Sequence, residues 1–189
     1  MDDPLLLDSP IALESARLNL RCPRPGDGSV VQPGVAETIS QLRRFPASLP
    51  WALAEPTVER SEAFCRDAQA RYLGRTALPM LIFLKEGNTY VGSIGLRDIE
   101  WSIPKFEIGY WCRTSMQGKG LALEAVRRLS EFALHELKAR RVEALPDEEN
   151  HESRRLCERA GYVLEGIRRN DRVTPDGVLR STCIFALTQ

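Results

Sequence analysis

The chain has 189 residues, a formal net charge of zero, 43% hydrophobic and 28% charged residues, which is typical of one soluble globular domain. The neutral charge argues against nucleic-acid binding as the main activity, and a total of two histidines disfavours a zinc site. The five cysteines are far apart and form no Cys-x-x-Cys pair, which predicts reduced thiols in a cytoplasmic protein that holds no metal.

The N-terminus is expected to be a loose arm over residues 1–14, followed by one domain over residues 15–189. The first ten residues are acidic and contain no long apolar run. Neither a signal peptide nor a membrane span is therefore expected in this stretch.

Hydrophobic periodicity predicts seven strands and about four helices. Alternation and short apolar runs predict strands over residues 17–21, 81–84, 90–97, 105–112, 141–145, 162–167 and 178–187. Helical periods and capping residues predict helices over residues 35–45, 57–73, 117–138 and 150–160, with the glycines and prolines of residues 23–34 in a loop. These elements predict the mixed α/β class: a mostly antiparallel sheet with helices on both sides and one parallel crossover over residues 106–145.

A glycine-rich turn between the strand at 105–112 and the following helix predicts an anion site. Gly118 and Gly120 allow a ligand to approach the free N–H groups of the first helical turn, where the helix dipole also favours negative charge. The Gly118-Lys119-Gly120 sequence does not supply the Gly-Lys-Ser/Thr of a P-loop, and Leu123 stands where a dinucleotide fingerprint has its third glycine.

Two motifs resemble the Gcn5-related N-acetyltransferase (GNAT) superfamily. Gln117-Gly118-Lys119-Gly120-Leu121-Ala122 fits the pattern Gln/Arg-x-x-Gly-x-Gly/Ala of its pyrophosphate loop. About thirty residues later, Asn150-x-x-Ser153, followed by Gly161-Tyr162, is similar to the Asn-x-x-Ser/Ala helix of that family. The final hairpin, with Asp176-Gly177, resembles the RimJ/RimL branch, and the resemblance covers about residues 15–188.

The resemblance implies a GNAT fold and direct acetyl transfer from acetyl-CoA to an amine, without a metal. It implies that Gln117, Gly118, Lys119, Gly120, Leu121 and Ala122 hold the pyrophosphate. It also implies that the backbones of Cys112 and Arg113 meet the pantetheine and thioester. Asn150 would bind the pantetheine, and Arg154 or Arg155 could reach a coenzyme phosphate, although Asn150 is equally suited to cap the helix and the arginines to a solvated face.

The catalytic groups are less clear from the resemblance, because many relatives carry a tyrosine where this chain has Cys157. Ser153 is the candidate to support the leaving thiolate. Glu107 is the candidate base, against the alternative of an ordinary strand carboxylate. RimL-like enzymes can use a glutamate in the last hairpin, where this chain offers Asp171 or Arg172.

The acceptor is expected to be a primary amine, on a protein N-terminus or on a small molecule such as a polyamine or an antibiotic. Asp98, Glu100 and Glu107 are predicted to attract a cationic amine, and Trp51 either contacts it or only packs. The alternatives are a non-catalytic acyl-CoA-binding regulator on the same fold and a nucleotide-binding oxidoreductase. We expect a monomer or homodimer that binds neither nucleic acid nor a membrane.

Overall fold

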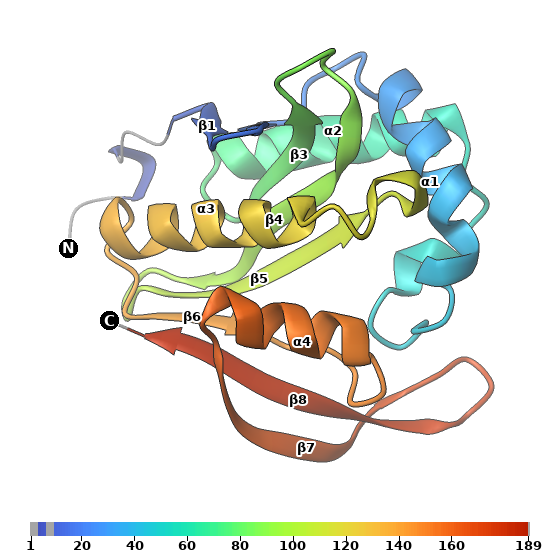
Figure 1. The fold of residues 1–189 in the computed structure, drawn as a ribbon, viewed down its shortest axis with the longest axis vertical. Helices are drawn as coiled ribbons and strands as arrows, with labels where there is room; N and C mark the ends of the chain where they lie inside the picture. The colour runs from blue at the N-terminus through green and yellow to red at the C-terminus, as the bar shows by residue number, and fades with distance from the viewer. Residues whose placement is uncertain (1–3, 7–9, 189) are drawn as a thin grey trace.

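The computed structural model describes residues 4–6 and 10–188 and has one sheet with helices on both faces (Figure 1). The strands are β1 (Ala12–Glu14), β2 (Leu18–Arg21), β3 (Leu78–Leu84), β4 (Tyr90–Glu100), β5 (Lys105–Cys112), β6 (Arg141–Ala144), β7 (Val163–Val173) and β8 (Leu179–Thr188). The α-helices are α1 (Gly28–Leu42), α2 (Val58–Leu73), α3 (Leu121–His135) and α4 (His151–Ala160). Short 3-10 turns are η1 (Pro4–Leu6), η2 (Pro50–Leu53) and η3 (Thr114–Met116).

The strand order is β1-β2-β3-β4-β5-β6-β8-β7, and β5–β6 is the parallel pair in an otherwise antiparallel sheet. This confirms the predicted mixed α/β class and the parallel crossover, which runs through α3. Helices α3 and α4 cover one face of the sheet, whereas α1 and α2 pack over β3 and β4 on the other. The candidate site described below lies beside β5.

The buried face of α3 explains the spacing of the apolar residues in this helix. α3 buries Leu121, Ala125, Val126, Leu129 and Phe132 against the sheet, at the spacing of one helical face. A second, smaller cluster beneath α1 and α2 contains Phe83 and Tyr90. The two clusters place the central strands between apolar layers, as the mixed class requires.

Two predictions about the N-terminal region were wrong. The sheet has eight strands and not seven, because Ala12–Glu14 pairs with β2 and so belongs to the sheet and not to a loose arm over residues 1–14. Residues 1–3 of that arm, and residues 7–9, lie outside the described residues. The added strand is three residues long and carries too little alternation to be recognised from sequence.

Helix α1 also begins earlier than predicted, inside the expected glycine and proline loop. A Cβ at Gly28 would lie 2.5 Å from the Glu62 backbone N, and one at Gly34 would lie 2.8 Å from Tyr90 Cε1. These glycines therefore serve close packing of α1 and not a turn. Pro33 is exposed on the outer side of the helix.

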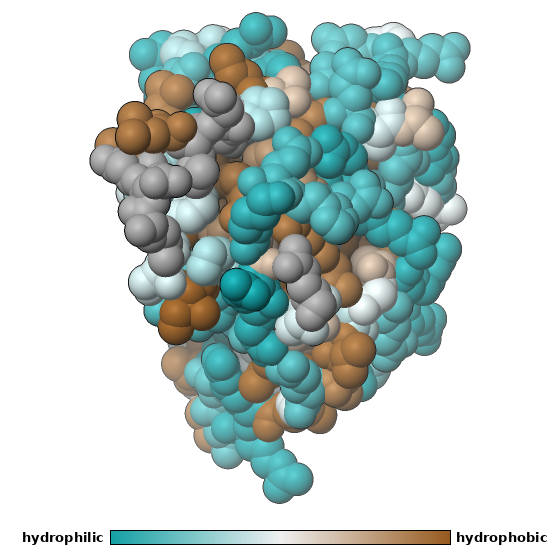
Figure 2. All heavy atoms as spheres, turned by 90° about the vertical axis from the view of Figure 1, so that its left-hand side faces the viewer, coloured by the Kyte–Doolittle hydropathy of each residue, from teal (hydrophilic) through white to brown (hydrophobic). Residues whose placement is uncertain are grey.

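The face of the molecule that Figure 2 shows, which is the left-hand side of Figure 1, is mixed in character. Outside the grey atoms, Figure 2 shows hydrophilic side chains across it with hydrophobic ones scattered among them. Among the described residues, the helices are all too short or too polar to cross a bilayer.

Candidate active site

The glycine loop, which we define as Gln117–Ala122, links β5 to α3. Gly118 and Gly120 have left-handed backbone angles, with φ of +73° and +74°, and Gly120 is the N-cap of α3. The first hydrogen bond of the helix runs from Glu124 N–H to Gly120 O, so the N–H groups of residues 121–123 have no intrahelical acceptor. The loop therefore has the geometry that an anionic group requires.

Side chains of α1 hold the entrance to this loop. Glu37 accepts a hydrogen bond from the Ser115 N–H at 2.6 Å and from the Arg113 guanidinium. The Ser115 N–H and the Arg113 guanidinium lower the pKa of Glu37 to about 2. Gln117 Nε2 donates to Gln41 Oε1 at 2.7 Å, so this side chain faces α1.

A second brace comes from the N-terminal part of the chain, and no sequence motif indicated it. Arg17 Nη1 donates to Lys119 O at 3.0 Å, and Arg17 Nε pairs with Glu124 at 2.6 Å. Lys119 Nζ donates to Ser115 O at 2.8 Å and so turns back onto the loop. Because Glu124 neutralises Arg17, Lys119 is the cation that these contacts leave beside the N–H groups of the glycine loop.

Strands β5 and β6 diverge after Glu107 and Glu143. They pair only between residues 105–107 and 141–143. After β6 the chain follows β8, with Cys183 N–H donating to Pro146 O at 2.9 Å, whereas β5 continues along β4. An edge of β5 is left without a neighbouring strand.

The backbone of β5 faces this opening at alternate residues. Arg113 N–H donates to Val91 O at 2.8 Å, and direction alternates along an antiparallel ladder, so the N–H groups of Tyr110 and Cys112 point away from β4. Of the two predicted backbone groups, Cys112 thus lies at the opening. The Arg113 N–H is occupied by β4, and the Arg113 side chain instead contacts Glu37.

Helix α4 places Asn150 and Ser153 at the other side of the opening. Asn150 Oδ1 accepts the Ser153 N–H at 3.1 Å and caps the helix, as the sequence indicated. Ser153 Oγ lies 2.9 Å from the Tyr110 hydroxyl, which also lies 3.4 Å from Cys157 Sγ. The Tyr110 hydroxyl therefore reaches the turn of α4 that holds Cys157, where the resemblance implies a tyrosine in many relatives.

The protonation of this group of three side chains follows from its burial. Burial raises the pKa of Tyr110 well above its ordinary value of 10 and raises the pKa of the Cys157 thiol. Both groups stay protonated at neutral pH. Sequence reasoning missed Tyr110, because it lies 43 residues from Ser153 and only the fold brings the two together.

Glu107 lies on the opposite face of β5. Its side chain is 11% exposed and is paired with Arg97, whose Nε lies 3.0 Å from Glu107 Oε1. Burial raises the pKa of Glu107 above the ordinary 4.5, while the Arg97 guanidinium acts in the opposite direction.

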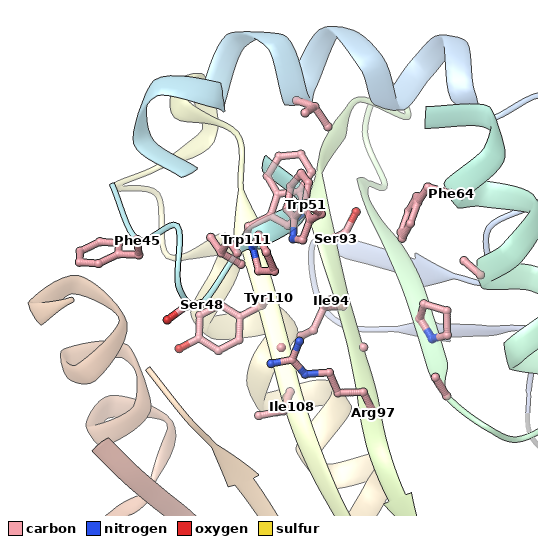
Figure 3. Close-up of a pocket in the computed structure, with 18 of the residues that line it drawn as sticks. Phe45, Ser48, Trp51, Phe64, Ser93, Ile94, Arg97, Ile108, Tyr110 and Trp111 are labelled. Carbon is pink, nitrogen blue, oxygen red and sulfur yellow. The ribbon is translucent and has the colours of Figure 1, made fainter. Parts of the chain in front are cut away.

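A cavity of about 740 Å³, here called the central cavity, brings together Trp51, Glu107, Asn150 and Ser153. Trp51 is 46% exposed and packs against Trp111 with ring centroids 6.2 Å apart (Figure 3). Much of the wall is apolar, including Phe45, Leu49, Trp51, Phe64, Ile94, Ile108 and Trp111.

Several predicted residues lie elsewhere. Arg155 is exposed on α4, and Asp98, Glu100 and Asp171 are exposed and do not line the central cavity. In the last hairpin the residue that reaches the cavity is Arg172. Arg154 Nη1 donates to Glu148 O at 2.9 Å and so braces the loop before α4.

Comparison with known proteins agrees with this geometry. The acetyltransferase (GNAT) domain family matches residues 17–163, which include the glycine loop and α4. The chain belongs to this family. A solved structure of RimL, the ribosomal L7/L12 alpha-N-protein acetyltransferase, in complex with coenzyme A has a TM-score of 0.85 and 20% sequence identity, covering 94% of this chain and 97% of that one. The GNAT fold is thereby confirmed.

Curated relatives match over part of their length. The probable N-acetyltransferase YjcK of Bacillus subtilis is 35% identical over 107 residues, which are 56% of this chain and 59% of YjcK. The N-acetyltransferase p20 of Bacillus licheniformis, described as uncharacterized, is 33% identical over 106 residues, with the same two shares. The chain thus spans about three fifths of the length of these relatives.

The donor groups of the site suit an organic anion and not a metal. Within residues 4–6 and 10–188, no cluster of three His, Cys, Asp or Glu side chains could hold a metal ion. The free N–H groups of the glycine loop, the Lys119 cation and the open edge of β5 together fit the pyrophosphate and pantetheine parts of acetyl-CoA.

Proposed function

We propose that the protein transfers the acetyl group of acetyl-CoA directly to a primary amine, on a protein N-terminus or on a small molecule. The observation that carries this proposal is the opening between β5 and α4: the glycine loop follows β5 in the chain, and Tyr110, Asn150 and Ser153 at the opening line the central cavity. One co-substrate can lie along the opening while the other occupies the cavity, so that the two meet near Ser153.

The glycine loop and the edge of β5 bind and orient the donor in this proposal. The N–H groups of residues 121–123 hold the pyrophosphate, with Lys119 as a nearby cation and Arg17 bracing the loop through Lys119 O. The Cys112 N–H faces the opening and donates to the thioester oxygen, where negative charge develops during attack. Asn150 keeps its amide NH2 for the pantetheine while its Oδ1 caps α4.

Acetyl-CoA supplies a thioester carbon that the amine nitrogen attacks, forming a C–N bond as the C–S bond breaks. Ser153 Oγ–H donates to the leaving sulfur, and the Tyr110 hydroxyl, 2.9 Å from Ser153 Oγ, orients it. Glu107 is the proposed base for the proton that the amine loses. Its raised pKa suits this role, and separation from the Arg97 guanidinium on acceptor binding would strengthen it.

An acceptor screen with acetyl-CoA tests the proposal. We expect free thiol release that depends on the amine, together with a product whose mass is higher by one acetyl group. Tight acetyl-CoA binding without transfer to any amine would instead support a non-catalytic acyl-CoA-binding regulator. Tight binding of a nicotinamide dinucleotide would favour the oxidoreductase hypothesis. The match to the acetyltransferase family argues against that hypothesis.

A further inference from the structure

The charges that line the central cavity are not those expected for a polycationic acceptor. Four carboxylates line it, and each is paired with an arginine of the protein. These pairs are Glu55–Arg43, Asp67–Arg71, Glu107–Arg97 and Asp147–Arg180. Of the three carboxylates predicted to attract the amine, Glu107 lines the cavity, whereas Asp98 and Glu100 are exposed and do not line it.

Arg172 is a half-buried cation of this cavity that is not neutralised. It comes from β7, and its Nη1 donates to Ser48 Oγ at 2.8 Å and to Leu145 O at 3.3 Å. Both partners are uncharged. Among the described residues, no carboxylate lies within ion-pairing distance of its guanidinium, and Nε and Nη2 have no protein acceptor.

Asp147, two residues after the Arg172 partner Leu145, pairs with a different arginine. Arg180, which stands opposite Arg172 in the β7–β8 ladder, donates to Asp147 at 2.6 and 3.0 Å. Asp147 also accepts the Glu149 N–H at 2.9 Å. Arg172 is therefore held in place by neutral groups, with the rest of its planar donor fork available to a ligand.

The wall of the central cavity also contains aromatic side chains. Trp51 and Trp111 pack together and line the same cavity as Arg172 and its partner Ser48. An amine with an apolar body would bury surface here, whereas a polyamine would meet an unpaired guanidinium and only neutralised carboxylates.

We propose that the acceptor is an amine that also carries an anionic group, a carboxylate or a phosphate, which Arg172 binds, and an apolar body that packs on Trp51 and Trp111. This inference rests on the proposed acetyl transfer, since it names the acceptor class of the same site. The anionic group, and not only the amine, then determines which molecules are acetylated.

The test compares two acceptors that differ only in one charge: a phenylalanine-containing dipeptide with a free C-terminal carboxylate and the same dipeptide as its C-terminal amide. Spermidine serves as the cationic acceptor. With saturating acetyl-CoA we expect kcat/KM to be about 10- to 100-fold higher for the acid than for the amide, the range of a charge-assisted hydrogen bond. Arg172→Gln should remove this preference by lowering kcat/KM for the acid. The kcat/KM for the amide and the KM for acetyl-CoA should stay unchanged.

Arg168→Gln is the matched control, because it removes the same charge from an exposed position of β7 outside the cavity. It should keep the preference for the acid. Equal rates for acid and amide, or faster acetylation of spermidine, would overturn the inference while leaving the acetyltransferase proposal intact. If acetyl-CoA binds but no amine of the acceptor screen, these three included, is acetylated, the proposed function fails and the inference falls with it.

Discussion

The glycine loop follows β5 in the chain, whereas the central cavity is lined by residues of β5 itself, and the two are built in opposite ways. The glycine loop is one contiguous segment, Gln117–Ala122, and its binding groups are backbone N–H groups. The central cavity is assembled from side chains of η2, α2, β4, β5 and β7, which are far apart in sequence. A backbone site tolerates side-chain changes but not a change of conformation, whereas a cavity of side chains can change its specificity one residue at a time.

The largest effect is expected where the backbone site is broken. Gly120→Glu adds a Cβ at φ +74° and a negative charge at the N-terminus of α3, so acetyl-CoA affinity should fall by at least roughly 100-fold in calorimetry. Gly177→Glu is the control, since Gly177 has φ +85° in the distant β7–β8 turn. Unchanged affinity in Gly120→Glu would remove the assignment of the glycine loop.

Ser153 lines the central cavity and is proposed to support the leaving thiolate of acetyl-CoA. Its replacement should therefore lower turnover without weakening acetyl-CoA binding. Ser153→Ala should lower kcat by roughly 10²- to 10³-fold, the usual effect of losing one hydrogen bond that matters in the transition state. Its acetyl-CoA affinity should change little. Ser40→Ala, on the exposed side of α1, is the control, and full turnover by Ser153→Ala would show that Ser153 only supports the start of α4.

Glu107 tests whether the cavity supplies the base. Its carboxylate must be ionised to accept a proton, and burial raises its pKa above 4.5, so kcat should rise with pH through that ionisation. Glu107→Gln should lower kcat by about 10²-fold and abolish that dependence. Glu143→Gln, a paired carboxylate on β6 outside the cavity, is the control, and a Glu107→Gln profile that overlays the parent would exclude Glu107 as the base.

The smallest expected effect separates the cap that Asn150 forms on α4 from its proposed contact with the pantetheine. Asn150→Ala should lose about 1 kcal/mol of unfolding free energy, because the cap on the Ser153 N–H is removed. Asn150→Ser can still cap the helix and should keep most of that stability in chemical denaturation. If Asn150→Ser also retains the parent affinity for acetyl-CoA, Asn150 is a cap and does not bind the pantetheine.

Local rules were sufficient for most elements of the fold. Thr57 caps α2 and Gly161 ends α4 at the residues the sequence indicated, because capping depends on side chains within a few residues. The early start of α1 was not predicted, since the reason for Gly28 and Gly34 is their contact with Glu62 and Tyr90, which lie far away in sequence.

The sequence alone determined the glycine loop, the strand before it and the cap of α4, because each depends on backbone conformation that neighbouring residues dictate. Only the tertiary structure decided that Tyr110 reaches Ser153, that Arg97 neutralises Glu107, and that Arg172 faces the central cavity without a carboxylate. Such contacts depend on which charges and hydroxyl groups packing brings within a few ångströms, and residues separated by tens of positions carry no local record of one another.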